Sequence, residues 1–425
     1  MSNKGFFKGM ITGMVIMCLF FAGISAGRVL MQEMNGKRVS DDRKSDEEDK
    51  SEEAKETVKL NEIITSPDFI EKYNFISSYI DTLYLNKEEI DAKEVEDGIF
   101  QGLIDSLGDK YADYYNKEEY DSFMEDTQGQ YGGIGTYVSQ DLKTGEIVIV
   151  NPFEGAPADV AGVKSGDILV EIDGESIVGM ELDEVVSIMK GEPDTDVLLG
   201  VYREDEKLDI VVTRKIVDVP TVQYEVIEED NIGYIYISSF DTITCTQFRE
   251  AVDELEKKNV DGLVIDVRNN GGGLISSVVD MLDRILPEGL VMYTETNKGR
   301  EEEYFSTDEE KYEKPYVVLI NEYSASASEV FAGAVQDYGY GTVIGTKSYG
   351  KGVVQSIIPL NGVNDGSAIK LTVSKYFTPN GRNIDGIGIE PDVEIELDNK
   401  KVIKKGEKKI DNQVDKAIEI IKSKK

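Results

Sequence analysis

The spacing of hydrophobic and polar positions changes character along the chain. Between Asn61 and Gln128, apolar residues recur at every third or fourth position, which is the period of an amphipathic helix. From Gln130 to Arg214 the apolar residues gather instead in short runs typical of strands. The predicted strands are 145–150, 168–172, 197–202 and 208–213, and the predicted helix among them is 181–189. The sequence therefore predicts a helical region over residues 61–129, followed by a β-rich domain over residues 130–214.

The segment 215–396 alternates strand-like and helix-like runs, which is the pattern of an α/β domain. Strands are predicted at 231–238, 262–267 and 316–320, and helices at 276–286 and 330–338. Two of the strand-to-helix turns have unusual compositions. The first contains the glycines Gly271–Gly273, and the second contains the serines Ser324, Ser326 and Ser328. The charged residues 397–425 are expected to form a tail with a helix beyond this core.

The first 60 residues contain an apolar segment and an acidic one. No charged residue occurs from Gly9 to Gly27, and a helix of this length spans about 28 Å, close to the thickness of a bilayer core. Lys4 and Lys8 precede this run, which favours a single-pass anchor in the cell membrane with residues 1–8 in the cytoplasm and the bulk of the chain outside. A cleaved signal peptide is the alternative. Residues 28–60 are predicted to form an acidic, disordered linker.

Composition removes several classes of function. The chain has no histidine and two cysteines, so it cannot form a Ser-His-Asp triad, a zinc site with histidine or a zinc site of four thiolates. Its formal net charge of −37 repels nucleic acid. We therefore expect none of these zinc sites and no nucleic-acid partner, and no motif in the chain implies another metal or an organic cofactor. Any catalysis must use carboxylates, hydroxyls, lysine or the backbone.

The segment 130–214 resembles a PDZ domain. The resemblance is carried by Gly155-Ala-Pro-Ala-Asp-Val-Ala-Gly162, Gly166-Asp-Ile-Leu169 and Ile172-Asp-Gly174. It implies a groove in which the C-terminus of a peptide adds as a strand and its carboxylate meets free backbone N–H groups. The loop expected to supply these groups consists of Gly132, Gly133, Ile134 and Gly135, although glycines in an ordinary turn would give the same motif.

The serine turn has two interpretations when it is considered alone. A helix start carries unpaired N–H groups and the positive end of the helix dipole, which suits an oxyanion. Capping of the helix by one of the serines, with Glu329 in the first turn, is the interpretation that the turn favours by itself. Downstream, Gly345-Thr-Lys-Ser-Tyr-Gly-Lys-Gly352 comes within one residue of a phosphate-binding loop. Gly352 replaces the required Ser or Thr and a strand-like run follows, so nucleotide binding is the weaker explanation of this segment.

Three motifs together resemble those of the carboxyl-terminal processing proteases. They are Ser324-Ala-Ser-Ala-Ser-Glu329, Gly350-Lys-Gly-Val-Val-Gln355 and Arg268-Asn-Asn-Gly-Gly-Gly273, and with the helical region and the PDZ segment they cover about 330 residues. The resemblance implies that Ser326 is the nucleophile and that Lys351, held neutral, is the general base. It also implies that the N–H groups of Ala327 and Gly272 bind the oxyanion. The family often has proline at Gly271, so the choice between Gly271 and Gly272 is open.

The same resemblance implies that Gln355 orients the lysine. Gln355 follows Lys351 by four residues, so both face one side if they share a strand. A neutral amide suits this role. If Glu329 paired with Lys351 instead, the amine would stay charged and the site would be at rest.

We therefore expect a multidomain α/β protein with a membrane anchor, a helical region, a PDZ domain and a catalytic core over 215–396 that is similar to the crotonase and ClpP-like folds. The expected function is that of a membrane-anchored serine endopeptidase that cleaves exported or extracytoplasmic proteins recognised through their C-termini. A catalytically inactive PDZ scaffold at the membrane is the alternative, and a nucleotide hydrolase is a more distant one. The sequence leaves open whether the chain forms a homo-oligomer.

Overall fold

The computed structural model describes residues 59–307, 311–363, 365–398, 400–401, 403–405 and 408–424. The expected cytoplasmic segment 1–8, the anchor 9–27 and nearly all of the acidic linker 28–60 lie outside the described residues. The described residues divide into two compact units, one ending at Gly108 and one starting at Asp109. Within the described ranges, no helix is both long enough and apolar enough to cross a membrane.

The first unit consists of helices, as the spacing of its apolar residues predicts. Its elements are α2 (Leu60–Ile64), α3 (Pro67–Leu83), the 3-10 helix η1 (Lys87–Glu89) and α4 (Ala92–Asp105). Ser66 caps α3 by accepting a hydrogen bond from the N–H of Phe69 at 3.3 Å. Asp91 caps α4 in the same way, through the N–H groups of the two residues at 93 and 94.

The second unit begins with a short strand where helix was expected. β1 (Asp113–Tyr115) pairs antiparallel with β18 (Ala368–Phe377), and the ring of Tyr114 is buried. α5 (Lys117–Gln128) follows and starts at a capping box formed by Asn116 and Glu119. The helical prediction for residues 61–129 therefore holds outside the Tyr-rich segment, where cross-strand packing stabilises extended backbone instead.

Residues 136–213 form the β-rich domain, in an antiparallel sheet of order β3-β4-β5-β7-β8. Its elements are β3 (Thr136–Gln140), β4 (Ile147–Pro152), α6 (Pro157–Val160), β5 (Ile168–Ile172), β6 (Glu175–Ser176), α7 (Leu182–Met189), β7 (Asp196–Arg203) and β8 (Glu206–Thr213). Val197, Leu199 and Val201 alternate along β7 and are fully buried, as the two-residue period of a strand requires. The strands and the helix predicted for this domain are confirmed.

The α/β domain is built on a six-stranded sheet of order β10-β11-β12-β15-β16-β19, parallel except for its first pair. Its strands are β10 (Val222–Ile227), β11 (Ile232–Ile237), β12 (Leu263–Asp266), β15 (Tyr316–Ile320), β16 (Gly341–Gly345) and β19 (Val393–Glu394). Its helices are α8 (Thr244–Lys257), α9 (Ile275–Asp283), α10 (Ala327–Tyr338) and α11 (Asn412–Ser423). β15 is buried along its whole length, which explains its continuous apolar sequence.

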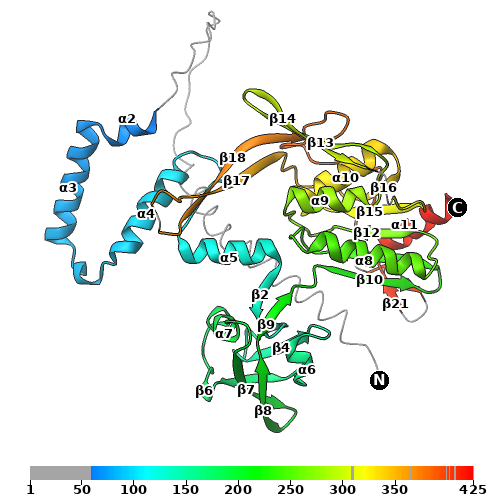
Figure 1. The fold of residues 1–425 in the computed structure, drawn as a ribbon, viewed down its shortest axis with the longest axis horizontal. Helices are drawn as coiled ribbons and strands as arrows, with labels where there is room; N and C mark the ends of the chain where they lie inside the picture. The colour runs from blue at the N-terminus through cyan, green and yellow to red at the C-terminus, as the bar shows by residue number, and fades with distance from the viewer. Residues whose placement is uncertain are drawn as a thin grey trace, which may run out of the picture. The chain divides into compact units, whose positions relative to one another are not determined.

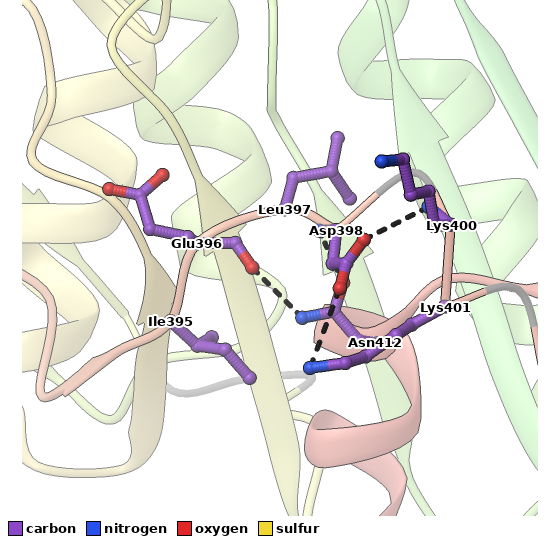
Figure 2. Close-up of a pocket in the computed structure, with 7 residues that line it drawn as sticks. All are labelled: Ile395, Glu396, Leu397, Asp398, Lys400, Lys401 and Asn412. Atoms are coloured by element: carbon purple, nitrogen blue, oxygen red, sulfur yellow. Dashed lines mark hydrogen bonds and ion pairs between the residues drawn. The ribbon is translucent and has the colours of Figure 1, made fainter.

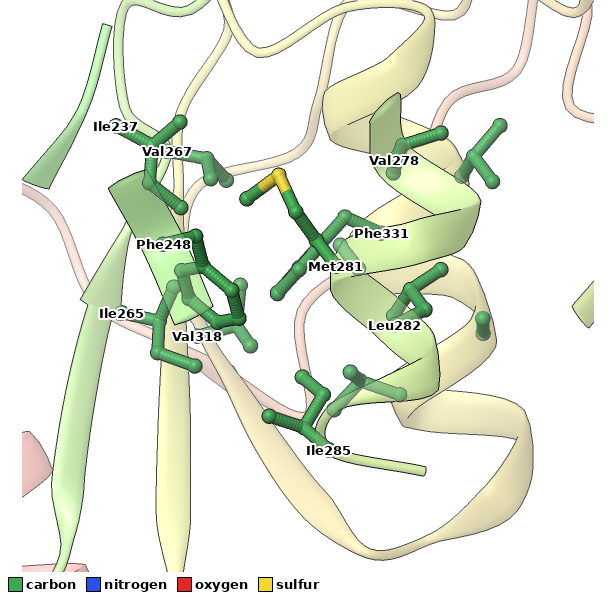
Figure 3. Packing of buried hydrophobic residues seen from close by; sticks show 14 of the residues in the cluster. Ile237, Phe248, Ile265, Val267, Val278, Met281, Leu282, Ile285, Val318 and Phe331 are labelled. Atoms are coloured by element: carbon green, nitrogen blue, oxygen red, sulfur yellow. The ribbon is translucent and has the colours of Figure 1, made fainter. Parts of the chain in front are cut away.

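Helices cover both faces of this sheet (Figure 1). Val318 of β15 packs on one face with Phe248 of α8 and Phe331 of α10 (Figure 3). Its neighbour Val317 packs on the other face with Ile418 of α11. The helix that we expected in a tail beyond residue 396 is therefore part of the core, because its apolar stripe covers that face of the sheet.

A third sheet and two short strand pairs complete the fold. The third sheet joins β1 and β18 with β13 (Gly289–Thr296), β14 (Gly299–Ser306) and β17 (Val353–Pro359). β2 (Gln130–Gly133) pairs with β9 (Lys215–Asp218) where the chain enters and leaves the β-rich domain. β20 (Ile403–Lys405) and β21 (Lys408–Ile410) form a hairpin before α11.

Candidate active site

The three serines at the junction of β15 and α10 lie in different environments. Ser324 is buried, and its Oγ donates to the carbonyl of Val267 at 2.8 Å. Ser328 is also buried, and its Oγ donates to the carbonyl of Asn270 at 2.9 Å. Ser326 is partly exposed, and within the described part of the chain its side chain makes no hydrogen bond outside the first turn of α10. Ser324 and Ser328 therefore hold the turn in place, and Ser326 presents the hydroxyl that is left for reaction.

Ser326 has a backbone conformation that serine rarely adopts. Its φ is 55° and its ψ is −114°. Its N–H donates to the carboxylate of Glu329 at 2.9 Å, and its carbonyl accepts a hydrogen bond from the hydroxyl of Tyr376 at 3.2 Å. The surrounding contacts thus hold a strained residue at the start of α10, and such strain is concentrated at active sites.

One buried carboxylate joins the serine turn to the loop that carries the lysine. Glu329 is fully buried and accepts hydrogen bonds of 2.5–2.9 Å from the N–H groups of Ser326, Gly350 and Lys351 and from the hydroxyl of Ser348. The N–H groups of Ser326 and Lys351 donate to the same oxygen, Oε2. Glu329 therefore binds the backbone of Lys351, and among the described residues it makes no ion pair with the amine.

The amine of Lys351 lies 4.8 Å from the centre of the Tyr111 ring. Burial, followed by the positive charge of Lys370, lowers the pKa of Lys351 to about 8, although the charge of Glu329 acts in the opposite direction. At pH 7 about a tenth of an amine with this pKa is unprotonated, far more than for an ordinary lysine, and a general base requires this neutral form. The described structure contains no hydrogen bond between Nζ and Ser326 Oγ, and such contacts commonly tighten only when substrate binds.

Asn270 fixes the glycine loop against the serine turn. Its Nδ2 donates to the carbonyl of Ile237 at 3.0 Å, and its Oδ1 accepts a hydrogen bond from the N–H of Gly272 at 2.8 Å. Gly272 has a φ of 107°, and a Cβ there would lie 2.8 Å from the Cβ of Ser326 and 3.0 Å from the nitrogen of Ala327. Only glycine can approach the nucleophile turn this closely.

The structure places both predicted oxyanion donors beside Ser326 but leaves them in different states. In the described part of the chain, the N–H of Ala327 makes no hydrogen bond. The N–H of Gly272 donates to Asn270 instead, so it must exchange that partner to bind an oxyanion. The N–H of Gly271, the other position considered, has no hydrogen bond among the described residues, and this glycine is exposed.

Gln355 does not contact Lys351 in the structure. Its Nε2 donates to Oγ1 of Thr372 at 3.2 Å, and it makes no hydrogen bond to the lysine within the described ranges. Lys351 precedes β17, which starts at Val353, and a register shift falls between Val354 and Gln355. The expectation of a common face assumed one regular strand from Lys351 to Gln355, and neither the start of β17 nor the register shift meets that assumption.

The four residues expected to bind a carboxylate do not form one loop. Gly132 and Gly133 belong to β2 and pair with β9 at the entrance of the domain. The prediction that these two glycines lie in a loop is therefore wrong. Ile134 is buried in the core of the domain. Gly135 has a φ of 75° and precedes β3, which pairs with β4 and lies at the edge of its sheet. Gly135 and the edge of β3 are therefore the part that retains the geometry expected of a peptide-binding strand.

The structure contradicts the interpretation of residues 345–352 as a phosphate-binding loop. The N–H groups of Gly350 and Lys351 donate to Glu329, and the strand β17 follows where a phosphate loop requires a helix.

A pocket of about 640 Å³ lies elsewhere, near the start of α11 (Figure 2). Its lining comes from residues 395–412 and includes none of the predicted site residues.

Sequence reasoning missed two residues of this arrangement. Asn270 occupies the asparagine position of the motif that starts at Arg268, so its spacing from the glycines was a usable signal. Tyr111 gave no signal beyond its place in a Tyr-rich stretch, because its position depends on the pairing of β1 with the distant β18.

Known proteins are similar in sequence to most of this chain. The sequence model of peptidase family S41 matches residues 231–395, and that of the PDZ domain matches residues 148–203. Carboxy-terminal processing protease CtpA of Bacillus subtilis is 36% identical over 335 residues, which cover 78% of this chain and 70% of that protein. CtpB of the same organism is 36% identical over 336 residues, covering 77% and 67%. A probable CtpA-like serine protease of Staphylococcus aureus strain COL is 34% identical over 336 residues, covering 78% and 66%. The chain therefore belongs to the carboxy-terminal processing proteases of peptidase family S41, and it is a serine-type peptidase with a PDZ domain.

Proposed function

We propose that this peptidase is anchored in the cell membrane and cleaves extracytoplasmic proteins that it recognises through their C-termini, with Ser326 as nucleophile and Lys351 as general base. The observation that carries the site assignment is the contact of both residues with Glu329. The backbone N–H groups of Ser326 and Lys351 donate to the same oxygen of Glu329, Oε2. The amine of Lys351 makes no ion pair in the described part of the chain. The parallel sheet with helices on both faces agrees with a crotonase or ClpP-like core.

The reaction follows from this arrangement. Ser326 Oγ attacks the carbonyl carbon of the scissile peptide bond, and its proton passes to Nζ of Lys351. Lys351 then delivers a proton to the nitrogen of the leaving group, and the C–N bond breaks to give an acyl-enzyme. A water molecule that loses its proton to Lys351 attacks this ester, and Lys351 returns the proton to Oγ of Ser326 as the C–O bond breaks, which regenerates the serine and the neutral amine.

The oxyanion of each tetrahedral intermediate is assigned to the start of α10. The N–H of Ala327 is unbonded there among the described residues, and the helix dipole adds positive potential. Gly272 is the second donor once its N–H leaves the side chain of Asn270, two residues earlier in the same loop.

Recognition and location are assigned to two other parts of the chain. Gly135 and the edge strand β3 support capture of a substrate C-terminus by strand addition. The uncharged run from Gly9 to Gly27 supports the anchor, and an anchor in this orientation restricts the substrates to exported proteins.

Single substitutions in the serine turn test the assignment. Ser326→Ala should abolish cleavage of a protein substrate with an accessible C-terminus while leaving the circular dichroism spectrum unchanged. Ser324→Ala and Ser328→Ala should retain cleavage and lose stability, by about 1 kcal/mol for each missing hydrogen bond. Lys351→Arg should be inactive because a guanidinium stays protonated. Cleavage by the Ser326→Ala variant would show that the nucleophile is wrongly assigned.

A further inference from the structure

The ring of Tyr111 is close to two lysine amines. The amine of Lys351 is 4.8 Å from the ring centre, and the amine of Lys110 is 4.6 Å from it. Lys110 also contacts Tyr349, with its amine 3.5 Å from the hydroxyl and 5.3 Å from the ring centre. Lys110 is exposed, whereas Lys351 is partly buried.

The backbone of Tyr111 is held by contacts that lead back to Gln355. Oδ1 of Asp109 accepts a hydrogen bond from the N–H of Tyr111 at 2.9 Å. Burial raises the pKa of Asp109, but hydrogen bonds from Tyr111 and Thr372 outweigh it and hold that pKa below its ordinary value. Thr372 in turn accepts the hydrogen bond of Gln355 through Oγ1 at 3.2 Å. A continuous set of contacts therefore runs from Gln355 to the ring above the lysine.

The second unit supplies a rigid support for this segment. β1 begins two residues after Tyr111 and pairs with β18, the strand that contains Thr372. β17, which carries Gln355, pairs with the same β18. The ring and the glutamine are thus positioned from one sheet.

We propose that Tyr111 is a positioning residue for the general base: its ring covers the amine of Lys351 and excludes water from it. Gln355 acts on the base indirectly, by holding Thr372 and Asp109 in the places that fix this ring. The inference rests on the proposed role of Lys351 as the base of the reaction.

Two effects of the ring on the amine oppose each other. The face of an aromatic ring attracts a cation, whereas loss of water disfavours one. Burial is the largest influence on Lys351, so removal of the ring should raise the pKa of the amine. An increase of about one unit would lower the fraction of neutral amine about tenfold near neutral pH. The charged groups that influence this amine are Lys370, Glu329, Lys110 and Asp109. Substitution of Tyr111 changes none of these residues, although Tyr111→Ala removes the ring that the amine of Lys110 contacts.

The test measures the amine directly and so does not depend on catalysis. In the full chain carrying Ser326→Ala, the rate at which acetic anhydride labels Lys351 is followed by peptide mass spectrometry from about pH 6 to 11, which spans the ordinary titration of lysine. Tyr111→Ala should move the midpoint of labelling upward by about one unit. Tyr111→Phe keeps the ring and should leave the midpoint unchanged. Tyr349→Ala removes a ring that contacts Lys110 but not Lys351, and it should also leave the midpoint unchanged.

A second variant separates the ring from its support. Thr372→Val removes the hydroxyl that joins Gln355 to Asp109 and leaves the ring of Tyr111 unchanged. It should move the midpoint of labelling in the same direction by a smaller amount. In the chain with Ser326 restored, Tyr111→Ala should reduce cleavage about tenfold near neutral pH and less at alkaline pH. An unchanged midpoint in Tyr111→Ala, with a normal circular dichroism spectrum, overturns the inference even if Lys351→Arg is inactive. Activity in Lys351→Arg overturns the proposed function and leaves the labelling result standing.

Discussion

The carboxylate of Glu329 receives four donors in the interior, whereas the amine of Lys351 has no hydrogen-bond acceptor among the described residues. Three of the four donors are backbone N–H groups from two segments far apart in the sequence. Glu329 therefore fixes geometry, because it determines where the backbones of Ser326 and Lys351 stand. Lys351 is left available to exchange protons.

Glu329→Gln tests this structural role. An amide has one acceptor oxygen, and its NH₂ group would face N–H donors that have no other partner. We expect the free energy of unfolding to fall by about 1–3 kcal/mol, measured by urea denaturation, together with a loss of peptide cleavage. Glu322→Gln is the matched control, because Glu322 lies in the same turn but is exposed. Equal stability of the two variants would contradict the role given to Glu329.

The lowered pKa of Lys351 predicts that both the rate of cleavage and the free energy of unfolding rise with pH. Cleavage should rise with pH through about 8 and persist above it, since the neutral amine is the reactive form. The folded state releases this proton near pH 8 and the unfolded state near the ordinary 10.5, so between these values the unfolded state binds more protons and stability rises with pH. Lys351→Met should therefore be more stable than the wild type at neutral pH.

Calorimetry at several pH values checks that expectation. The advantage of Lys351→Met should shrink between about pH 8 and 10.5, as the wild type loses its buried charge. A difference that stays constant across this window would mean that the amine is not held in a destabilising environment.

At the scale of elements, local patterns predicted the structure wherever the determining contacts are local. The strands of the PDZ domain, β15 and α10 could be predicted because each carries its own alternation, apolar run or cap. β1, the bulge in β17 and the pairing of β2 with β9 could not, because each depends on a partner strand from a distant part of the chain. Ser326 and Lys351 came from motifs, whereas the contacts of Gln355 required the register of β17 on β18.

Arg268 shows the same limit within a motif. It precedes the glycines of the site, yet its guanidinium binds Asp266, Asp411 and Gln413. The last two residues belong to the start of α11, so a residue adjacent to the site serves the attachment of the C-terminal helix. Its role could not be predicted while residues 397–425 were considered a tail.

At the scale of the whole molecule, recognition and cleavage are assigned to different domains that are connected through β2 and β9. Amidation of a substrate C-terminus separates the two. It should lower kcat/KM for a protein substrate with an unstructured tail, because the carboxylate that we propose the PDZ domain binds is lost while the scissile bond is unchanged. A short peptide that reaches Ser326 without the PDZ domain should be cleaved equally in both forms. Equal kcat/KM for the amidated and free-acid proteins would contradict capture of the carboxylate.

Because α11 covers one face of the sheet, the core of the α/β domain can be completed only at the end of translation. The ribosome adds the strands of the sheet up to Glu394 before it adds Ile418 and Ile421, which cover Val317 and Leu319 on one face. Until those residues emerge, the nascent chain presents an open apolar face and lacks the partners of Arg268. A chain that ends before α11 is therefore expected to be degraded by quality-control proteases and to have no protease activity of its own.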